Sequence, residues 1–299
     1  MKQMSAMNLN ACRLCPRACG VDRTRGEMGV CGMPDTFWRS RCAPHRWEEP
    51  PISGTRGSGT VFFTGCNLRC VFCQNRTISR EGVGCPVTEE ELADKILALQ
   101  EQGVHNINLV TPTHYTAQLV RLLERIKPSL QIPVVWNCGG YESVEALRMA
   151  EGLVDIYLPD FKYISSDLSA AYSAALDYAD RATEAVLEMY RQVGKYCEQD
   201  GLAAKGMIIR HLVLPGCRAD SMAVLRHIAA ILPTADIRVS IMRQYTPDFA
   251  MDCPHKNLRR RVTEFEYTSV LEEANRLGLE GFSQGKDAAD KAYTPDFLQ

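Results

Sequence analysis

The chain has 299 residues, which suits one large domain or two smaller ones. Hydrophobic residues make up 45% of it and charged residues 23%, as in ordinary globular proteins. Its net charge of −2 provides no basic surface for nucleic acid, so we expect no nucleic-acid partner. It has no apolar run of about 18 residues that could span a membrane, and its N-terminus lacks the apolar core of a signal peptide. We therefore expect a cytoplasmic protein without a membrane partner.

The chain contains 13 cysteines, and eight of them precede residue 74. In a reducing compartment such a number indicates metal or redox chemistry rather than disulfide bonds. Four lie in residues 11–32, ACRLCPRACGVDRTRGEMGVCG, with the spacing C-x2-C-x3-C-x11-C: Cys12, Cys15, Cys19 and Cys31. This spacing predicts a metal site, either structural zinc or an iron–sulfur cluster. The alternative is a flexible segment of reduced thiols. We expect residues 1–58 to form a Cys-rich extension and linker.

From residue 59 onward, short apolar runs alternate with helical patterns. The predicted strands are 59–65, 106–112, 133–138, 154–160, 207–215 and 237–245. The predicted helices are 88–103, 116–127, 144–152, 168–178 and 182–199, the first opening with the capping pattern Thr88-x-x-Glu91. This alternation predicts an α/β fold, a partial (β/α)6 TIM-like barrel of parallel strands over residues 59–284. A complete eight-unit barrel typically needs about 250 residues for its repeats. Residues 285–299 are predicted to form a tail.

Polar segments follow each predicted strand. They are TGC (64–66), TPTHY (111–115), NCGGY (137–141), PDFKY (159–163), PGC (215–217) and RQYTPD (243–248), and the fifth strand also carries Arg210 and His211. In parallel α/β folds the carboxyl ends of the strands meet at one rim, where ligands bind. We therefore expect these segments to form a single site.

The segment TGCNLRCVFCQN (64–75) places Cys66, Cys70 and Cys73 within eight positions. A zinc site would need a fourth ligand, and the loop contains no histidine or carboxylate. Three thiolates can instead hold three corners of a cubane iron–sulfur cluster. The fourth iron is then open to a small molecule, which is a catalytic arrangement. A zinc site with a distant fourth ligand and inert thiols are the alternatives.

CNLRCVFC (66–73) matches the CX3CXΦC motif, with Phe72 as the aromatic residue, and the chain is identified as a member of the radical S-adenosylmethionine (radical SAM) superfamily. Over residues 59–245 it resembles the branch of pyruvate formate-lyase-activating enzyme. The resemblance implies that S-adenosylmethionine chelates the open iron of a [4Fe-4S] cluster. One electron from a donor such as flavodoxin or ferredoxin then cleaves the sulfonium. The resulting 5′-deoxyadenosyl radical abstracts hydrogen from a substrate.

The resemblance also implies roles for residues along the rim. Asp160-Phe161-Lys162 is similar to the segment that contacts S-adenosylmethionine in that branch, and Arg210 and Tyr245 occupy positions near the ligand. The chain departs from the branch at Thr111-Pro112-Thr113-His114, where a Gly-Gly-Glu-type segment is usual, and at Asn137-Cys138, where an Asp-led segment binds a monovalent cation. The expected cofactor-binding residues are Phe72, Thr111, Thr113, Asn137, Asp160, Lys162, Arg210 and Tyr245. His114 and Cys138 are the expected catalytic residues; for His114 the alternative is a rim histidine that only forms hydrogen bonds.

Three functions remain open. The first is radical-based hydrogen abstraction from a protein or peptide, such as activation of a glycyl-radical enzyme. The second is modification of a small metabolite or of a non-glycyl protein target. The third is a non-catalytic iron–sulfur or metal-binding adaptor.

Overall fold

The computed structural model describes residues 9–289, 295 and 297. The six predicted strands are present as parallel neighbours, and a seventh, β10, extends the row. These strands are β2 (Ser58–Phe63), β4 (Ile107–Val110), β5 (Val134–Cys138), β6 (Ile156–Pro159), β8 (Leu202–Leu212), β9 (Arg238–Met242) and β10 (Gly281–Ser283). Within the described residues the sheet runs β10-β9-β8-β6-β5-β4-β2-β1-β3 and does not close on itself. The predicted α/β partial barrel is thereby confirmed.

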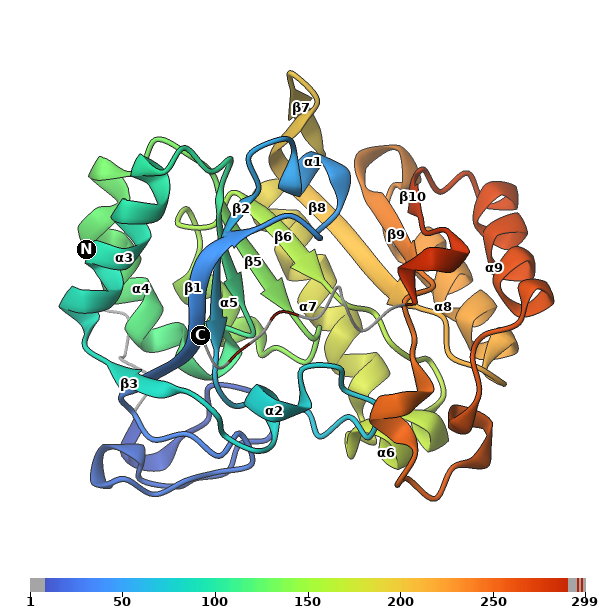
Figure 1. Ribbon diagram of the computed structural model, residues 1–299, viewed down its shortest axis with the longest axis horizontal. Helices are drawn as coiled ribbons and strands as arrows, with labels where there is room; N and C mark the ends of the chain where they lie inside the picture. The colour runs from blue at the N-terminus through green and yellow to red at the C-terminus, as the bar shows by residue number, and fades with distance from the viewer. Residues whose placement is uncertain (1–8, 290–294, 296, 298–299) are drawn as a thin grey trace.

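The longer helices pack against the sheet, as Figure 1 shows, with α3 and α4 on one side and α8 and α9 on the other. Their bounds are α3 (Glu89–Glu101), α4 (Thr116–Ile126), α5 (Val144–Met149), α6 (Ser166–Ser173), α7 (Tyr178–Val193), α8 (Arg218–Ile231) and α9 (Glu264–Arg276); two short helices are α1 (Pro50–Ser53) and α2 (Arg76–Ser79). The capping box of Thr88 and Glu91 starts α3 as predicted. Strands β2, β4, β5 and β6 are buried at every position, because helices or loops cover both faces.

Several elements differ from those predicted. The predicted helix 182–199 is displaced: α7 ends at Val193, because Gly194 adopts φ +66° there, and residues Cys197–Gln199 form β7. Strand β7 is exposed throughout and pairs antiparallel with β8, so it lacks the apolar pattern that marks a buried strand.

Two further antiparallel strands complete the other edge of the sheet. They are β1 (Phe37–His45), which pairs with β2, and β3 (Cys85–Val87), which pairs with β1. Strand β1 therefore belongs to the barrel sheet although it lies within the predicted extension 1–58. Part of that extension (1–8) and part of the predicted tail 285–299 lie outside the described residues.

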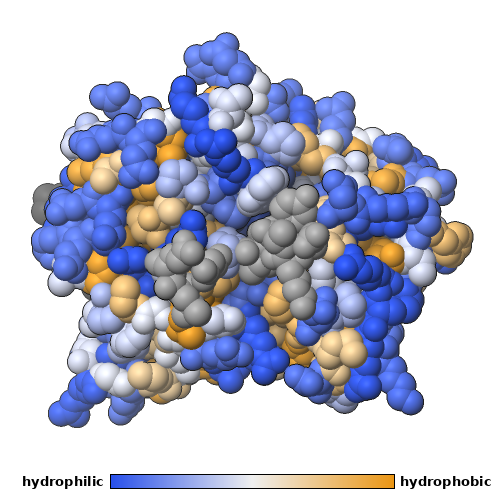
Figure 2. All heavy atoms as spheres, in the orientation of Figure 1, coloured by the Kyte–Doolittle hydropathy of each residue, from blue (hydrophilic) through white to orange (hydrophobic). Residues whose placement is uncertain are grey.

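Residues 9–36 fold against the carboxyl ends of the strands, below the sheet in Figure 1. The backbone N–H of Cys66 donates to the carbonyl of Cys31 over 3.3 Å, and the Arg69 guanidinium donates to the carbonyl of Val30 over 3.1 Å. The N-terminal cysteines are thus joined directly to the loop of Cys66. The face in Figure 2 is largely hydrophilic, with hydrophobic residues in separate small patches. Among the described helices, none combines the length and apolar character that crossing a membrane requires.

Candidate active site

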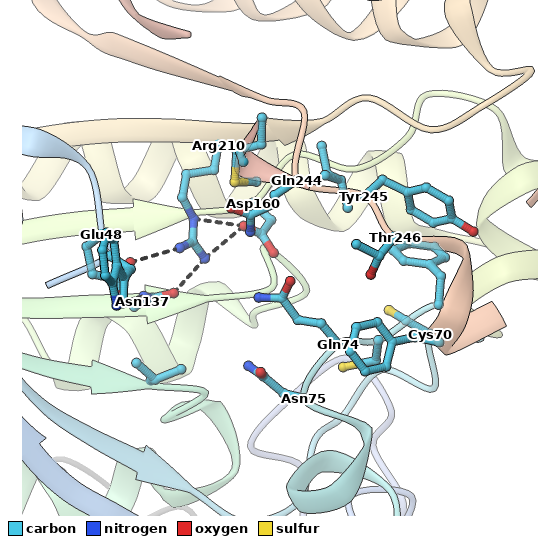
Figure 3. A pocket seen from close by; sticks show the side chains of 18 of the residues that line it. Glu48, Cys70, Gln74, Asn75, Asn137, Asp160, Arg210, Gln244, Tyr245 and Thr246 are labelled. Carbon is cyan, nitrogen blue, oxygen red and sulfur yellow. Dashed lines mark hydrogen bonds and ion pairs between the residues drawn. The ribbon is translucent and has the colours of Figure 1, made fainter. Parts of the chain in front are cut away.

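A cleft lies at the rim where the strands end, and we call it the central cleft (Figure 3). Its walls combine the cysteine loop, the ends of β5, β6, β8 and β9, and the segment between β1 and α1. Its lining includes Trp47, Glu48, Cys70, Phe72, Cys73, Gln74, Asn75, Asn137, Asp160, Lys162, Arg210, Met242, Gln244, Tyr245, Thr246 and Ala288. Of the six polar segments predicted to form one site, the three at 137–141, 159–163 and 243–248 contribute residues to this cleft, whereas those at 64–66, 111–115 and 215–217 do not line it.

The three cysteines of the loop after β2 lie close together. Burial, and then the neighbouring thiols of Cys70 and Cys73, raise the pKa of the Cys66 thiol. Each sulfur has a polar neighbour: the N–H of Leu68 donates to Cys66 Sγ over 3.4 Å and the Ser79 hydroxyl to Cys73 Sγ over 3.3 Å, while Ser173 Oγ lies 3.0 Å from Cys70 Sγ. Such donors stabilise thiolate ligands.

A buried charge network occupies the other end of the cleft (Figure 3). The Arg210 guanidinium lies 2.9 Å from Asp160 Oδ1 and 3.4 Å from Glu48 Oε2, and it donates to Asn137 Oδ1 over 2.6 Å. Lys162 Nζ pairs with Asp160 Oδ2 over 2.5 Å. Burial alone would raise the pKa of Asp160, but Arg210 and Lys162 outweigh it and hold that pKa below its usual range. Asp160 is therefore a carboxylate held between two cations.

Aromatic residues form the wall nearest the cysteines. The rings of Phe72 and Tyr245 meet edge to face with centroids 6.2 Å apart, and Phe72 meets Tyr172 at 6.4 Å. The Tyr245 hydroxyl donates to the carbonyl of Leu258, which fixes the ring. The cleft thus has an apolar wall beside the cysteines and a charged wall opposite.

Four of the ten predicted catalytic and cofactor-binding residues do not line the cleft, and of the three loop cysteines Cys70 and Cys73 line it but Cys66 does not. Thr111 adopts a positive φ of 59° and donates its N–H to the carbonyl of Asn137, so it shapes the turn after β4. The Thr113 hydroxyl donates to Glu142 Oε1 over 2.6 Å. Cys138 is 2% exposed and lies beneath the rim, where burial raises the pKa of its thiol well above the usual range. The fourth is His114.

His114 is buried beside the N-terminal cysteines. It lines a small cavity together with Cys12, Cys15, Cys19 and Cys31. Its Nε2 lies 2.8 Å from the carbonyl of Thr64, so Nε2 carries the proton, and Nδ1 has no hydrogen-bond partner among the described residues. Burial, and then Arg23, lower the pKa of His114 to about 3, which keeps the ring neutral. We predicted that His114 is a catalytic residue of the cleft, but the structure places it at the cavity of the N-terminal cysteines.

Two groups of cysteines, the three in the loop after β2 and the four in the N-terminal segment, are the candidate metal ligands. Throughout the described ranges, no group of three or more His, Cys, Asp or Glu side chains is arranged to hold a metal ion. The N-terminal group shares its cavity with Arg23, which is 1% exposed and donates to the carbonyls of His114 and Pro34. A buried guanidinium complements the negative charge that several thiolates would carry.

Sequence reasoning missed several residues that line the cleft. Glu48 and Trp47 belong to HRWEEPP, which reads as a polar linker, and Gln74 and Asn75 directly follow the last cysteine of the loop. Figure 3 shows the Gln74 side chain extending toward the charge network. Because Gln74 and Asn75 directly follow the cysteine motif, the sequence alone could have identified them as residues of the site. No local pattern marks Glu48, because β1 and α1 bring it to the cleft.

Residues 60–216 match the family model of the radical SAM superfamily. That match covers more than half of the chain and includes the cysteine loop, Asp160, Lys162 and Arg210. The chain therefore belongs to the radical SAM superfamily. Membership implies a [4Fe-4S] cluster, S-adenosylmethionine, an external electron donor and redox-type enzyme chemistry.

Individual proteins are similar to this chain over most of its length. An uncharacterized protein of Methanocaldococcus jannaschii is 30% identical over 282 residues, which cover 90% of this chain and 75% of that protein. The fold is similar to Streptococcus suis SuiB bound to its precursor peptide SuiA, with a TM-score of 0.53 and 12% identity. That likeness covers 75% of this chain but 47% of SuiB. A spore photoproduct lyase variant gives a TM-score of 0.51 at 10% identity, covering 74% of each chain. These structural likenesses show the fold alone.

Proposed function

We propose that this protein cleaves S-adenosylmethionine reductively and that the 5′-deoxyadenosyl radical abstracts hydrogen from a protein or peptide. The observation that carries the proposal is the central cleft itself, in which the three-cysteine loop faces a buried network of charged side chains. An adaptor would not need such a network beside its cysteines, because buried charges cost free energy unless they pair or bind a ligand.

Cys66, Cys70 and Cys73 would hold the cluster, and the residues around them fit it, since the sulfurs have hydrogen-bond donors and an aromatic wall. When bound, the cluster supplies one electron and an open iron for the amine and carboxylate of S-adenosylmethionine. We assign Lys162 to the ligand carboxylate and Asp160 to its amine or ribose. Arg210, which donates to Asn137, positions Asp160, and Phe72 and Tyr245 exclude water from the reacting end.

Two observations bear on the substrate. A related fold, that of SuiB, has been crystallised with a precursor peptide, which supports a peptide substrate, and activation of a glycyl-radical enzyme is one form of such a reaction. A second cavity beside the cleft favours the alternative, in which a small metabolite or a non-glycyl protein side chain is modified. We propose flavodoxin or ferredoxin as the electron donor.

Reductive cleavage is tested on anaerobically reconstituted protein given dithionite and S-adenosylmethionine. We expect methionine and 5′-deoxyadenosine from the wild type and neither from Cys70→Ala. Cys197→Ala is the matched control, because Cys197 is exposed on β7, far from the rim in Figure 1. A wild-type protein that binds iron at the loop but releases no 5′-deoxyadenosine would overturn the proposal in favour of an adaptor. A glycyl-type radical signal in a partner protein would identify activation of a glycyl-radical enzyme, as opposed to modification of a small metabolite or of a non-glycyl protein target.

We further propose that Cys12, Cys15, Cys19 and Cys31 hold a second metal centre, of zinc or iron and sulfide, and that metal binding draws together thiols that are not arranged around an ion in the described structure. The four thiols and the unpartnered Nδ1 of His114 line one cavity, and buried Arg23 supplies compensating charge. The spacing differs from that of an eight-cysteine ferredoxin insert, which would follow the cysteine loop rather than precede it.

Metal analysis tests the second centre. We expect Cys15→Ala to lose either one zinc or about four irons per chain relative to the wild type, while the absorbance of the cluster at Cys66 remains. Zinc loss identifies a structural site and iron loss a second cluster. An unchanged metal content in Cys15→Ala excludes the centre.

A further inference from the structure

A second cavity adjoins the central cleft, and we call it the acidic chamber. It has a volume of about 500 Å³ and is lined by the segment Arg46–Pro50 and by residues of β8, β9 and β10. This volume lies within the range of small-molecule sites. Both cavities are lined by Trp47, Glu48, Arg210, Met242, Gln244 and Ala288, so they adjoin along these side chains. The chamber is thus placed to hold a molecule that reaches into the cleft.

Glu49 lines the acidic chamber but not the central cleft. The residue is 8% exposed, and its Oε2 has no hydrogen-bond partner within the part of the chain that the structure describes. The Ser240 hydroxyl hydrogen-bonds to the Glu49 carboxyl group. Burial raises the pKa of Glu49, and the positive charge of Arg210 opposes that rise. A buried carboxylate with an unsatisfied oxygen is costly unless a ligand completes it.

The buried acidic groups around the chamber outnumber the buried cations. The buried carboxylates are Glu48, Glu49 and Asp160, whereas the buried cations are Arg210 and Lys162. Both cations approach Asp160 to within 3.0 Å, and Arg210 reaches Glu48 less closely, at 3.4 Å. Glu49 is the carboxylate without an ion pair of its own among the contacts described, and the chamber's further cation, Arg46, is exposed to solvent. Burial raises the pKa of both Glu48 and Glu49, so a bound cation would favour the ionised form of Glu49.

We propose that the acidic chamber binds the ammonium or guanidinium group of the substrate, with Glu49 as its counter-ion. This inference rests on the proposed function, because it assigns the substrate of the same cleft. The cationic group belongs to a small amine or to a basic side chain of a peptide. In either case Glu49 holds the cation in the chamber, and the remainder of the substrate extends past Trp47 and Glu48 toward the cysteines.

Calorimetry on the reconstituted holoenzyme tests the assignment. The small-molecule probe is butane-1,4-diamine, its neutral counterpart is butane-1,4-diol, and the peptide probe is a capped Gly-Gly-Lys-Gly-Gly. We expect at least one cationic probe to bind and the diol not to bind. The probe that binds distinguishes a small amine from a peptide. We expect Glu49→Gln to weaken binding by at least about tenfold, because hydrogen bonds to charged groups are strong in buried sites.

Asp287→Asn is the matched control. Asp287 also lines the chamber but is exposed, so solvent screening should keep the loss of binding below about threefold. Glu49→Gln should fold, since the substitution removes a buried unpaired charge, and we expect its thermal midpoint to be at least that of the wild type without probe. Equal binding of diamine and diol, binding of none of the three probes, or unchanged binding in Glu49→Gln would each overturn the inference.

The proposed function is measured separately, as 5′-deoxyadenosine release by the wild type without any probe. Wild-type cleavage combined with no cationic binding refutes the chamber assignment alone. Cationic binding by a protein that does not cleave S-adenosylmethionine refutes the proposed reaction alone.

Discussion

Arg210 connects side chains that lie far apart in the sequence. Its guanidinium contacts Glu48 from the segment before α1, Asn137 at the end of β5 and Asp160 after β6. The side chain is 14% exposed and the two carboxylates are at most 15% exposed, so water screens these contacts weakly. The arginine therefore neutralises charges that would otherwise be buried without compensation.

We expect Arg210→Leu to lower the free energy of unfolding by about 3–5 kcal/mol, because it leaves Asp160 and Glu48 with less compensating charge. Urea denaturation measures the change. Arg181→Leu is the control, since Arg181 pairs with Asp177 on the surface of α7 with both side chains over 40% exposed. That pair should contribute less than about 1 kcal/mol. Equal losses in the two variants would contradict a buried network.

Glu142 gives the protein a pH-dependent stability. It is 1% exposed, and burial raises its pKa from 4.5 to about 7. Between these values the folded state keeps a proton that the unfolded state has lost, so stability from this group falls as the pH rises and is lowest above pH 7. The Thr113 hydroxyl can donate equally well to a glutamine at this position.

We expect Glu142→Gln to be more stable than the wild type by up to about 3 kcal/mol at pH 8, with the difference shrinking as the pH falls toward 5.5. Denaturation of both proteins across this range measures it. A constant difference, or a wild type that gains stability relative to the variant with rising pH, would refute the raised pKa.

At the scale of elements, the turns after the strands set the geometry of the rim. Gly140, in the turn after β5, has φ +78°, and a Cβ there would lie 2.1 Å from the carbonyl oxygen of Asp160. The Tyr178 hydroxyl donates to the carbonyls of Gly139 and Asp160 and so ties the β5 and β6 turns together. The close approach of these turns positions Asp160 beside Arg210.

We expect Gly140→Ala to cost at least about 2 kcal/mol of stability, through backbone strain and displacement of Asp160. Gly152→Ala separates the two causes, because Gly152 has φ +81° but no atoms within 4 Å of the added Cβ. Strain alone should cost about 1 kcal/mol there. If chemical denaturation gives the same loss for both, the contact with Asp160 is unimportant.

At the scale of the whole molecule, the N-terminal segment braces the cysteine loop. The Arg17 guanidinium donates to the carbonyl of Asn67 over 2.7 Å, to that of Ser173 over 3.1 Å and to that of Ala174. It therefore links the segment before β1 to the cysteine loop and to the end of α6.

We expect Arg17→Ala to accelerate loss of the loop's cluster to a chelator and to lower stability by about 1–3 kcal/mol, because three carbonyls lose their donor. The decay of iron–sulfur absorbance in the presence of EDTA measures the first effect. Arg13→Ala, at an exposed position in the same segment, should behave as the wild type. Equal decay in all three proteins would show that the N-terminal segment does not brace the loop.

The sequence by itself determined the three-cysteine loop, the parallel strands and the rim residues Asn137, Asp160, Lys162, Arg210 and Tyr245. These features are local: cysteine spacing fixes which thiols share a loop, and continuous apolar runs followed by polar turns mark buried strands. Tertiary structure alone placed His114 at the N-terminal cysteines, brought β1 into the sheet and delivered Glu48 and Glu49 to the cavities. The positions of His114 and Glu48 depend on contacts between segments 50 or more residues apart, as between His114 and Thr64, and no short-range pattern encodes such contacts. Strand β1 pairs with the nearer β2, but its sequence carries no apolar run that marks it as a strand of the sheet.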